Sequence, residues 1–233
     1  MPCELLVLAP HPDDAELHCG ATIARHTRRG QRVVVVDATR GELGSRGSVD
    51  QRRQEATAAA ECLGLHAREN LGLPDGAVDA DPLATRIALV AAIRRHKPAT
   101  IACLSGIARH PDHIALAAAA PGAVKAAALH LFSPESGAAW RCPRLVFYEA
   151  ELPLSPTLLL PATESDWETK QRAIRCYASQ FGLDGQDGPA TSITEAGFLD
   201  WIDARGRTWG QHAGAPFAEA FVSAEPWTLS QLA

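Results

Sequence analysis

Two short units rich in histidine and aspartate are the part of this sequence best suited to chemistry. Residues 11–14 read His-Pro-Asp-Asp, and residues 110–113 read His-Pro-Asp-His. Imidazole nitrogens and carboxylate oxygens bind catalytic zinc, which takes three protein ligands and keeps a fourth position for water. His11, Asp14 and His113 supply such a set if the two units meet. The pattern predicts one Zn²⁺ per chain at this point, with Fe²⁺, Co²⁺ and Mn²⁺ as alternatives.

The other polar side chains of these units have separate expected roles. Asp13 cannot easily share the ion with its neighbour Asp14, because adjacent side chains diverge, so we expect it to accept a proton from the metal-activated water. His110 is expected to stabilise an oxyanion as imidazolium, with Asp112 orienting its ring and favouring its charged form. The competing interpretation of the first unit is a tight turn whose aspartates cap the next helix.

Both units come directly after short apolar runs, at residues 5–9 and 100–104, and directly before a helix. Such runs are typical of buried parallel strands, and ligands bind at the carboxyl ends of these strands. Further strands and helices alternate along the first half with short connections. The sequence therefore predicts a single-domain α/β fold over residues 1–233: a doubly wound, mostly parallel, Rossmann-like sheet flanked by helices. The expected ranges are 32–38 and 69–71 for strands and 16–29, 50–63, 82–96 and 113–130 for helices.

The second half is less regular. Strands are expected at 144–148 and 157–160, and a capping box that begins at Thr163 opens a helix to Gln180. A further helix is expected over 195–207, followed by a loop at 206–216. The apolar stretch 217–222 is expected to dock on the rest of the domain.

Composition and charge exclude several classes of function. The net charge is −5, from 22 basic and 27 acidic residues, so nothing draws the chain to nucleic acid or an anionic membrane. The six cysteines form no C-x-x-C pair, which disfavours a thiolate zinc site and is typical of a reducing cytoplasm. We expect a cytoplasmic protein without signal peptide or membrane span. A dinucleotide site is disfavoured, because the first β–α turn lacks G-x-G-x-x-G and carries two carboxylates instead.

Several segments together resemble the LmbE-like or PIG-L family of zinc-dependent N-acetylglucosaminide deacetylases. In the first half these are residues 9–16, 39–42 with 53–56, 71–76 and 109–113. In the second half, residues 170–181 and 217–222 are similar to the bacillithiol-pathway branch, which removes acetate from N-acetylglucosaminyl-malate. The resemblance implies zinc on His11, Asp14 and His113, with Asp13 as base and His110 as acid or electrophile. It also implies a small sugar substrate and a homo-oligomer.

We expect three side chains to contact substrate. Arg53 is a candidate anchor for a substrate carboxylate or hydroxyl, its alternative being an exposed helix arginine, and Glu42 and Arg109 lie in the family-like segments. Two roles stay open for Glu16, as a helix cap or as a group that holds a ligand in place. Residues 105–108 and 206–216 depart from the family pattern and are expected to line the acceptor side.

The sequence thus predicts a hydrolase that removes the N-acetyl group of a small glucosamine conjugate. The malate conjugate is the substrate we expect. Two alternatives remain. One is deacetylation of another N-acetylglucosaminide, such as a mycothiol-like compound, a chito-oligosaccharide or an antibiotic sugar. The other is a non-catalytic metal- or sugar-binding relative.

Overall fold

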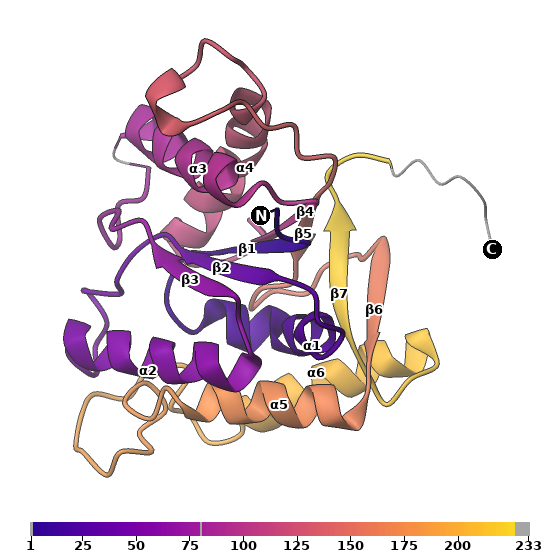
Figure 1. The fold of residues 1–233 in the computed structure, drawn as a ribbon. Coiled ribbons are helices and arrows are strands. Elements are labelled where there is room, and N and C mark those ends of the chain that lie inside the picture. Colours follow the sequence, from indigo (N-terminus) through magenta and orange to yellow (C-terminus); the bar gives the residue numbers. More distant parts are fainter. Residues whose placement is uncertain (1, 80, 227–233) are drawn as a thin grey trace.

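The computed structural model describes residues 2–79 and 81–226 and arranges seven strands in one sheet (Figure 1). The strand order is β3-β2-β1-β4-β5-β7-β6. Strands β1 to β5 pair in parallel, whereas β7 runs antiparallel to both β5 and β6. The predicted fold, a mostly parallel doubly wound sheet, is confirmed. The strands are β1 (Leu5–Ala9), β2 (Val33–Asp37), β3 (Ala67–Asn70), β4 (Thr100–Leu104), β5 (Leu145–Tyr148), β6 (Leu158–Ala162) and β7 (Phe217–Ser223).

Helices cover both faces of this sheet. In Figure 1, α3 and α4 lie on one face, while α1, α2, α5 and α6 lie on the other. Successive strand residues point to opposite faces. Leu6 and Leu8 of β1 therefore pack with the α3–α4 core, and Leu5 and Val7 pack with the core of the other face. The helices are α1 (Asp14–Arg28), α2 (Val49–Leu63), α3 (Pro82–His96), α4 (Pro111–Ala127), α5 (Glu164–Arg175) and α6 (Phe198–Ala213).

The strand order places the two histidine-rich units side by side. From β1 the chain runs outward to β2 and β3, then crosses back so that β4 pairs with β1 on its other side. Such a reversal opens a crevice at the carboxyl ends of the strands, where α/β proteins bind ligands. The first unit follows β1 and the second follows β4, so both lie at this crevice.

The second half differs from the prediction at two helices. Helix α5 has the expected capping box at Thr163 but ends at Arg175, before Gln180. Helix α6 extends to Ala213, so most of the expected loop at 206–216 is helical. Its glycines are sites of close packing: a Cβ on Gly206 would lie 2.2 Å from the Trp167 ring. Tight packing therefore outweighs the low helix propensity of glycine here.

The expected docking of the apolar stretch 217–222 is confirmed, because it forms β7 between β5 and β6. Across residues 2–79 and 81–226, none of the helices has both the length and the hydropathy that a membrane span requires.

Candidate metal centre and active site

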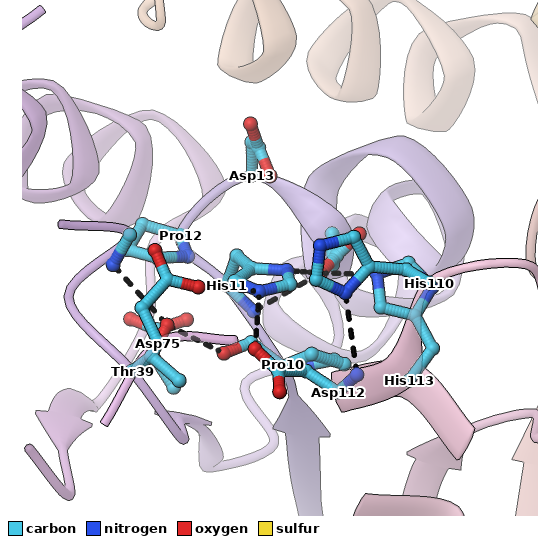
Figure 2. A network of polar contacts seen from close by, with 12 residues as sticks. Pro10, His11, Pro12, Asp13, Thr39, Asp75, His110, Asp112 and His113 are labelled. Carbon is cyan, nitrogen blue, oxygen red and sulfur yellow. Dashed lines mark hydrogen bonds and ion pairs between the residues drawn. The ribbon is translucent and has the colours of Figure 1, made fainter. Parts of the chain in front are cut away.

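Three imidazoles from the two units gather at the crevice (Figure 2). The ring centroids of His11 and His110 are 4.6 Å apart, those of His11 and His113 are 5.4 Å apart, and those of His110 and His113 are 5.1 Å apart. His11 comes from the β1–α1 turn and the other two from the start of α4 and the residue before it. The prediction that the two units meet is confirmed.

The Asp14 carboxylate lies between two of these rings. Its Oδ2 atom is 3.1 Å from Nδ1 of His11 and 3.4 Å from Nε2 of His113. Ligand atoms held at about 2.0–2.2 Å by a tetrahedral zinc lie about 3.3–3.6 Å from one another. The two Asp14 distances are close to this spacing, so His11, Asp14 and His113 could hold one divalent cation. Among the described residues, two other groups have ligand atoms within 4.8 Å of one another: His11 with His110 and His113, and His11 with Asp75 and Asp112.

The second nitrogen of each of these imidazoles also faces a carboxylate. Nε2 of His11 is 3.1 Å from Asp112 Oδ2 and 3.2 Å from Asp75 Oδ1. Nδ1 of His113 is 3.3 Å from Glu151 Oε2. Carboxylates in this position fix the tautomer and orientation of metal-binding histidines and increase their basicity.

Two of these carboxylates had no role in the sequence analysis. Glu151 follows β5, the neighbour of β4, so it reaches the same edge of the sheet. Its position just after a parallel strand next to β4 could have predicted that Glu151 lies near the histidines. Asp75 lies in the family-like segment 71–76, and only the folded structure shows that its side chain reaches His11.

The placement of Asp112 corrects the prediction that it orients His110. Its carboxylate contacts His11 and accepts the backbone N–H groups of Gly76 at 2.7 Å and Val78 at 3.2 Å. Only the backbone N–H of Asp112 faces His110, donating to Nδ1 at 3.3 Å. Since Nδ1 accepts, the proton of a neutral His110 ring is on Nε2.

The surroundings of His110 oppose the positive charge that was predicted for it. Partial burial, followed by the neighbouring rings of His11 and His113, lowers the pKa of His110 below its ordinary value. This shift favours the neutral ring, which offers Nε2–H as a donor, over the predicted imidazolium.

The electrostatics of the cluster favour positive charge at its centre. Burial opposes protonation of His11, but hydrogen bonds to Asp112, Asp14 and Asp75 outweigh it and raise the pKa to about 12. The pKa of His113 rises to about 9 against the same opposition from burial, chiefly through Asp14. A metal ion displaces protons from its ligands when it binds. The carboxylates that hold protons here can equally stabilise a divalent cation.

Asp13 has an unusual backbone conformation, with φ 117° and ψ −31°. This region is unfavourable for a residue with a Cβ and is found mostly at functional sites. The residue occupies the N-cap position of α1, yet its side chain makes no capping hydrogen bond. In Figure 2 its carboxylate points away from Asp75 and Asp112. The helix-cap interpretation of Asp13 is therefore not supported.

The surroundings of Asp13 suit a general base. Its side chain lines a cavity, and burial raises its pKa to about 7, partly opposed by the positive charge of Arg52. Base catalysis is most efficient when the pKa lies near the working pH.

Arg52, and not the predicted Arg53, is the arginine of α2 that reaches the site. Arg52 is buried and donates to the carbonyl oxygens of Pro12 at 2.8 Å and Gly41 at 2.9 Å, and it lies 3.5 Å from Asp13 Oδ2. The Arg53 side chain is 70% exposed and, among residues 2–79 and 81–226, pairs only with Asp50, so the alternative of an exposed helix arginine holds.

The helical periodicity of α2 indicates that Arg52, and not Arg53, lies on its buried face. The buried residues of α2 are Arg52, Glu55, Ala56, Ala59 and Leu63, which follow the i, i+3, i+4, i+7 and i+11 pattern of one helical face. Extending the apolar face of Ala56, Ala59 and Leu63 back by one turn reaches Arg52.

Glu42, Arg109 and Glu16 have different surroundings. Glu42 is exposed, does not line the cavity, and accepts the backbone N–H groups of Arg40 and Asp75, both at 3.2 Å. Arg109 lines the cavity, and its backbone N–H donates to Glu151. Glu16 is fully buried, pairs with Arg68 and is not one of the residues that line the cavity.

The cavity beside the histidines has a volume of about 870 Å³, enough for a small-molecule ligand. Among the described residues that line it, none belongs to 105–108 or 206–216, contrary to the prediction that these segments line the acceptor side. Its lining also includes Leu43, Gly44 and Ser45 of the β2–α2 loop, and Ser192, Ile193, Glu195, Phe198 and Trp201 from the start of α6 and the segment before it.

The fold and this site define a class: doubly wound α/β proteins with a His/Asp cluster that could hold a cation, and an adjacent carboxylate, at the carboxyl edge of the sheet. The family model described as GlcNAc-PI de-N-acetylase (PIG-L) matches residues 6–124, about half of the chain, and contains both units. The chain belongs to this family.

Individual relatives extend the comparison. A Mycobacterium bovis 1D-myo-inositol 2-acetamido-2-deoxy-alpha-D-glucopyranoside deacetylase is 38% identical over 145 residues, which cover 47% of each chain. The chain thus spans about half the length of the curated relatives it matches. A conserved protein from Thermus thermophilus has a similar structure, with a TM-score of 0.85, 35% identity and 99% of both chains covered.

A third relative is named as a hydratase, a different reaction from that of the mycobacterial deacetylase. The 4-carboxy-2-hydroxymuconate hydratase of Pseudomonas putida KT2440 has a TM-score of 0.78 and 26% identity, with 100% of both chains covered. The shared architecture is therefore compatible with more than one reaction.

Proposed function

We propose that this protein is a metal-dependent deacetylase of a small N-acetylglucosamine conjugate. The observation that carries the proposal is the Asp13 carboxylate, held in a strained conformation beside the His11–Asp14–His113 cluster and freed from helix capping. Binding alone requires no such group, whereas amide hydrolysis requires a base for the attacking water.

Each residue then has a defined part in the reaction. A cation held by His11, Asp14 and His113, Zn²⁺ in our proposal, supplies Lewis acidity at the acetyl group. Asp13 takes a proton from the attacking water and later delivers one to the leaving amine. His110 donates its Nε2–H to the acetyl oxygen, where negative charge develops.

The supporting residues hold this arrangement in place. Arg52 binds the loop that carries Asp13 and offsets its charge. Asp112, Asp75 and Glu151 orient the two ligand imidazoles. Arg109 stays a candidate contact for substrate at the cavity rim.

The finer assignments are also proposals. The malate conjugate of the bacillithiol pathway is supported by the similarity of residues 170–181 and 217–222 to that branch, and the inositol conjugate by the mycobacterial relative. We further propose a cytoplasmic homo-oligomer that binds neither nucleic acid nor membrane. A single domain over 1–233 fits the one continuous sheet of the described residues.

The second candidate is a hydratase, favoured by the full-length similarity to the Pseudomonas enzyme. One assay separates the two. Metal-loaded protein is incubated with N-acetylglucosaminides of malate, inositol, chitobiose type and methanol, and in parallel with 4-carboxy-2-hydroxymuconate. We expect acetate and free amine from the sugars, abolished by chelator and by Asp13→Asn. Hydration of the muconate with no acetate release would replace the proposal with the second candidate.

A further inference from the structure

Part of the cavity wall belongs to a segment without regular secondary structure. Residues 182–197, which lead into α6, contain neither helix nor strand, and most of their side chains are exposed. In Figure 1 this segment is the orange loop beside the start of α2. It contributes Ser192, Ile193 and Glu195 to the cavity lining. A segment with so few buried side chains needs contacts from elsewhere to keep one conformation.

Arg46, in the loop between β2 and α2, makes such contacts. Its Nε donates to the carbonyl oxygen of Ser179 at 3.0 Å. Its Nη2 donates to the carbonyl oxygen of Gln186 at 2.6 Å, and its Nη1 to that of Pro189 at 3.4 Å. Nη2 also lies 4.0 Å from Asp184 Oδ1, and the Arg46 side chain is only 10% exposed. A planar guanidinium with five donors can hold several carbonyls at once in this way.

Arg46 is also the polar connection between this segment and more distant parts of the molecule. Among residues 2–79 and 81–226, every hydrogen bond or ion pair that joins 182–197 to the chain outside 178–201 comes from the Arg46 side chain. The other support is apolar, since Ile193 packs against the core. Loss of the guanidinium would therefore remove the polar support of this wall.

The other end of the same loop is fixed to the cation cluster. The backbone N–H of Leu43 donates to Asp75 Oδ2 at 2.7 Å, and the backbone N–H of Asp75 donates to Glu42 at 3.2 Å. The second carboxylate oxygen of Asp75 is 3.2 Å from Nε2 of His11. Residues 42–46 thus connect the cation cluster to the cavity wall, and Arg46 makes the contact with the wall.

Two glycines leave room for this contact. A Cβ on Gly188 would lie 2.6 Å from Nη1 of Arg46, and a Cβ on Gly47 would lie 2.6 Å from Oγ of Ser179. Backbone can approach this closely only where the residue has no side chain. The Arg46 carbonyl oxygen in turn accepts Nε2–H of Gln180 at 2.6 Å. The two loops therefore hold each other through groups on both sides.

We propose that Arg46 is a positioning residue, which orders the cavity wall before substrate binds. Arg46 does not line the cavity itself, so it acts through residues 182–197. A wall that is already ordered loses less conformational entropy when a ligand binds, and a wall that is only partly ordered weakens the apparent affinity by the ordered fraction. Only the kinetic part of the test below rests on the proposed deacetylation.

Limited proteolysis of metal-loaded protein tests the ordering without substrate. Subtilisin cleaves a folded chain where it opens locally, so the cleavage rate reports the opening equilibrium when opening and closing are fast. Arg46→Ala removes hydrogen bonds from a charged donor. Cleavage within 182–197, located by mass spectrometry, should therefore be at least about tenfold faster. The control is Arg175→Ala, because Arg175 is exposed and its side chain makes no hydrogen bond within the described residues. It should be cleaved like the wild type.

Steady-state kinetics and urea unfolding distinguish positioning from a general loss of structure. In Arg46→Ala, KM for the best N-acetylglucosaminide should rise at least about threefold with kcat near wild type, because the lost order affects ground and transition states alike. Bound metal should stay at one equivalent. The urea midpoint should change little, because Gln186 and Pro189 are exposed and their carbonyls can accept water instead. Arg46→Lys, which keeps the charge without the planar fork, should give intermediate values.

Gly188→Ala provides a second variant that leaves Arg46 in place but crowds its guanidinium. It should also increase cleavage within 182–197, by less than Arg46→Ala. Faster cleavage confined to this segment supports the inference even if no acetate is released and the proposed function fails. Wild-type cleavage of both Arg46 variants would overturn it even if deacetylation is established. So would an unchanged KM in Arg46→Ala, or a large fall in the urea midpoint with cleavage throughout the chain.

Discussion

Replacing Arg52 by alanine tests whether this residue holds the catalytic loop. The change removes the hydrogen bonds to the carbonyls of Pro12 and Gly41 and the cation beside Asp13. Each orphaned buried polar group costs about 1–3 kcal/mol. Asp13, whose pKa burial raises to about 7, can take up a proton when the cation is removed, so it adds little to this loss. We expect the free energy of unfolding to fall by about 3–5 kcal/mol, because these losses share one side chain and do not add fully.

The neighbouring arginine is the matched control. Arg53 is 70% exposed and pairs with Asp50, itself 82% exposed. Pairs of this kind contribute about 0–1 kcal/mol, so Arg53→Ala should leave both stability and activity close to wild type. Urea unfolding measures the first quantity and acetate release the second.

A second variant keeps the test informative if Arg52→Ala does not fold. Arg52→Lys retains the charge but cannot donate to both carbonyls in the same fixed geometry. It should fold, with stability between the alanine variant and wild type, and lose deacetylase activity through displacement of Asp13. Wild-type stability and activity for both Arg52 variants would refute the reasoning, as would a loss of activity confined to Arg53→Ala.

Three further predictions follow from the described contacts. Asp13→Ala should keep stoichiometric metal and lose about 10²–10⁴ in kcat, and a near-normal rate would remove it as the base. Gly206→Ala should lower the free energy of unfolding by about 1–3 kcal/mol, because its Cβ would clash with the Trp167 ring. In the control Gly122→Ala, the Cβ would lie no closer than 3.5 Å to another side chain, so thermal unfolding should show a gain in stability of up to about 1 kcal/mol. Burial opposes ionisation of Asp166, but hydrogen bonds from Arg28 and Thr163 lower its pKa. The ionised carboxylate therefore adds to the free energy of unfolding above pH 3.8, and this contribution is lost as the pH falls through the pKa of the folded state. In urea unfolding measured against pH, Asp166→Asn should flatten the decrease in stability at acid pH.

The sequence predicted the features that depend on strand ends. Two apolar runs, each followed by a histidine-rich unit, were sufficient to place both units at one edge of a parallel sheet. The capping box at Thr163 was likewise local, since both of its hydrogen bonds lie within four residues. These features need only the chain's own periodicity and the general rule for ligand sites in α/β sheets.

What the sequence could not predict depends on segments meeting from elsewhere. Asp112 contacts His11 because the backbone N–H groups of Gly76 and Val78, from the loop after β3, hold its carboxylate there. No spacing within residues 110–113 contains that information. The length of α6 was missed for a related reason: the predicted loop begins at Gly206, which is the position where Trp167 packs against the helix.

The central claim is that two loops distant in sequence share one cation through nitrogen and oxygen ligands. Zinc-edge X-ray absorption on protein loaded with one equivalent, alongside metal analysis of His113→Ala, tests it directly. We predict a first shell of nitrogen and oxygen at about 2.0–2.1 Å with outer scattering from two imidazoles, and loss of bound zinc in the variant. Sulfur scattering near about 2.3 Å, or a full equivalent of zinc retained by His113→Ala, would contradict the account.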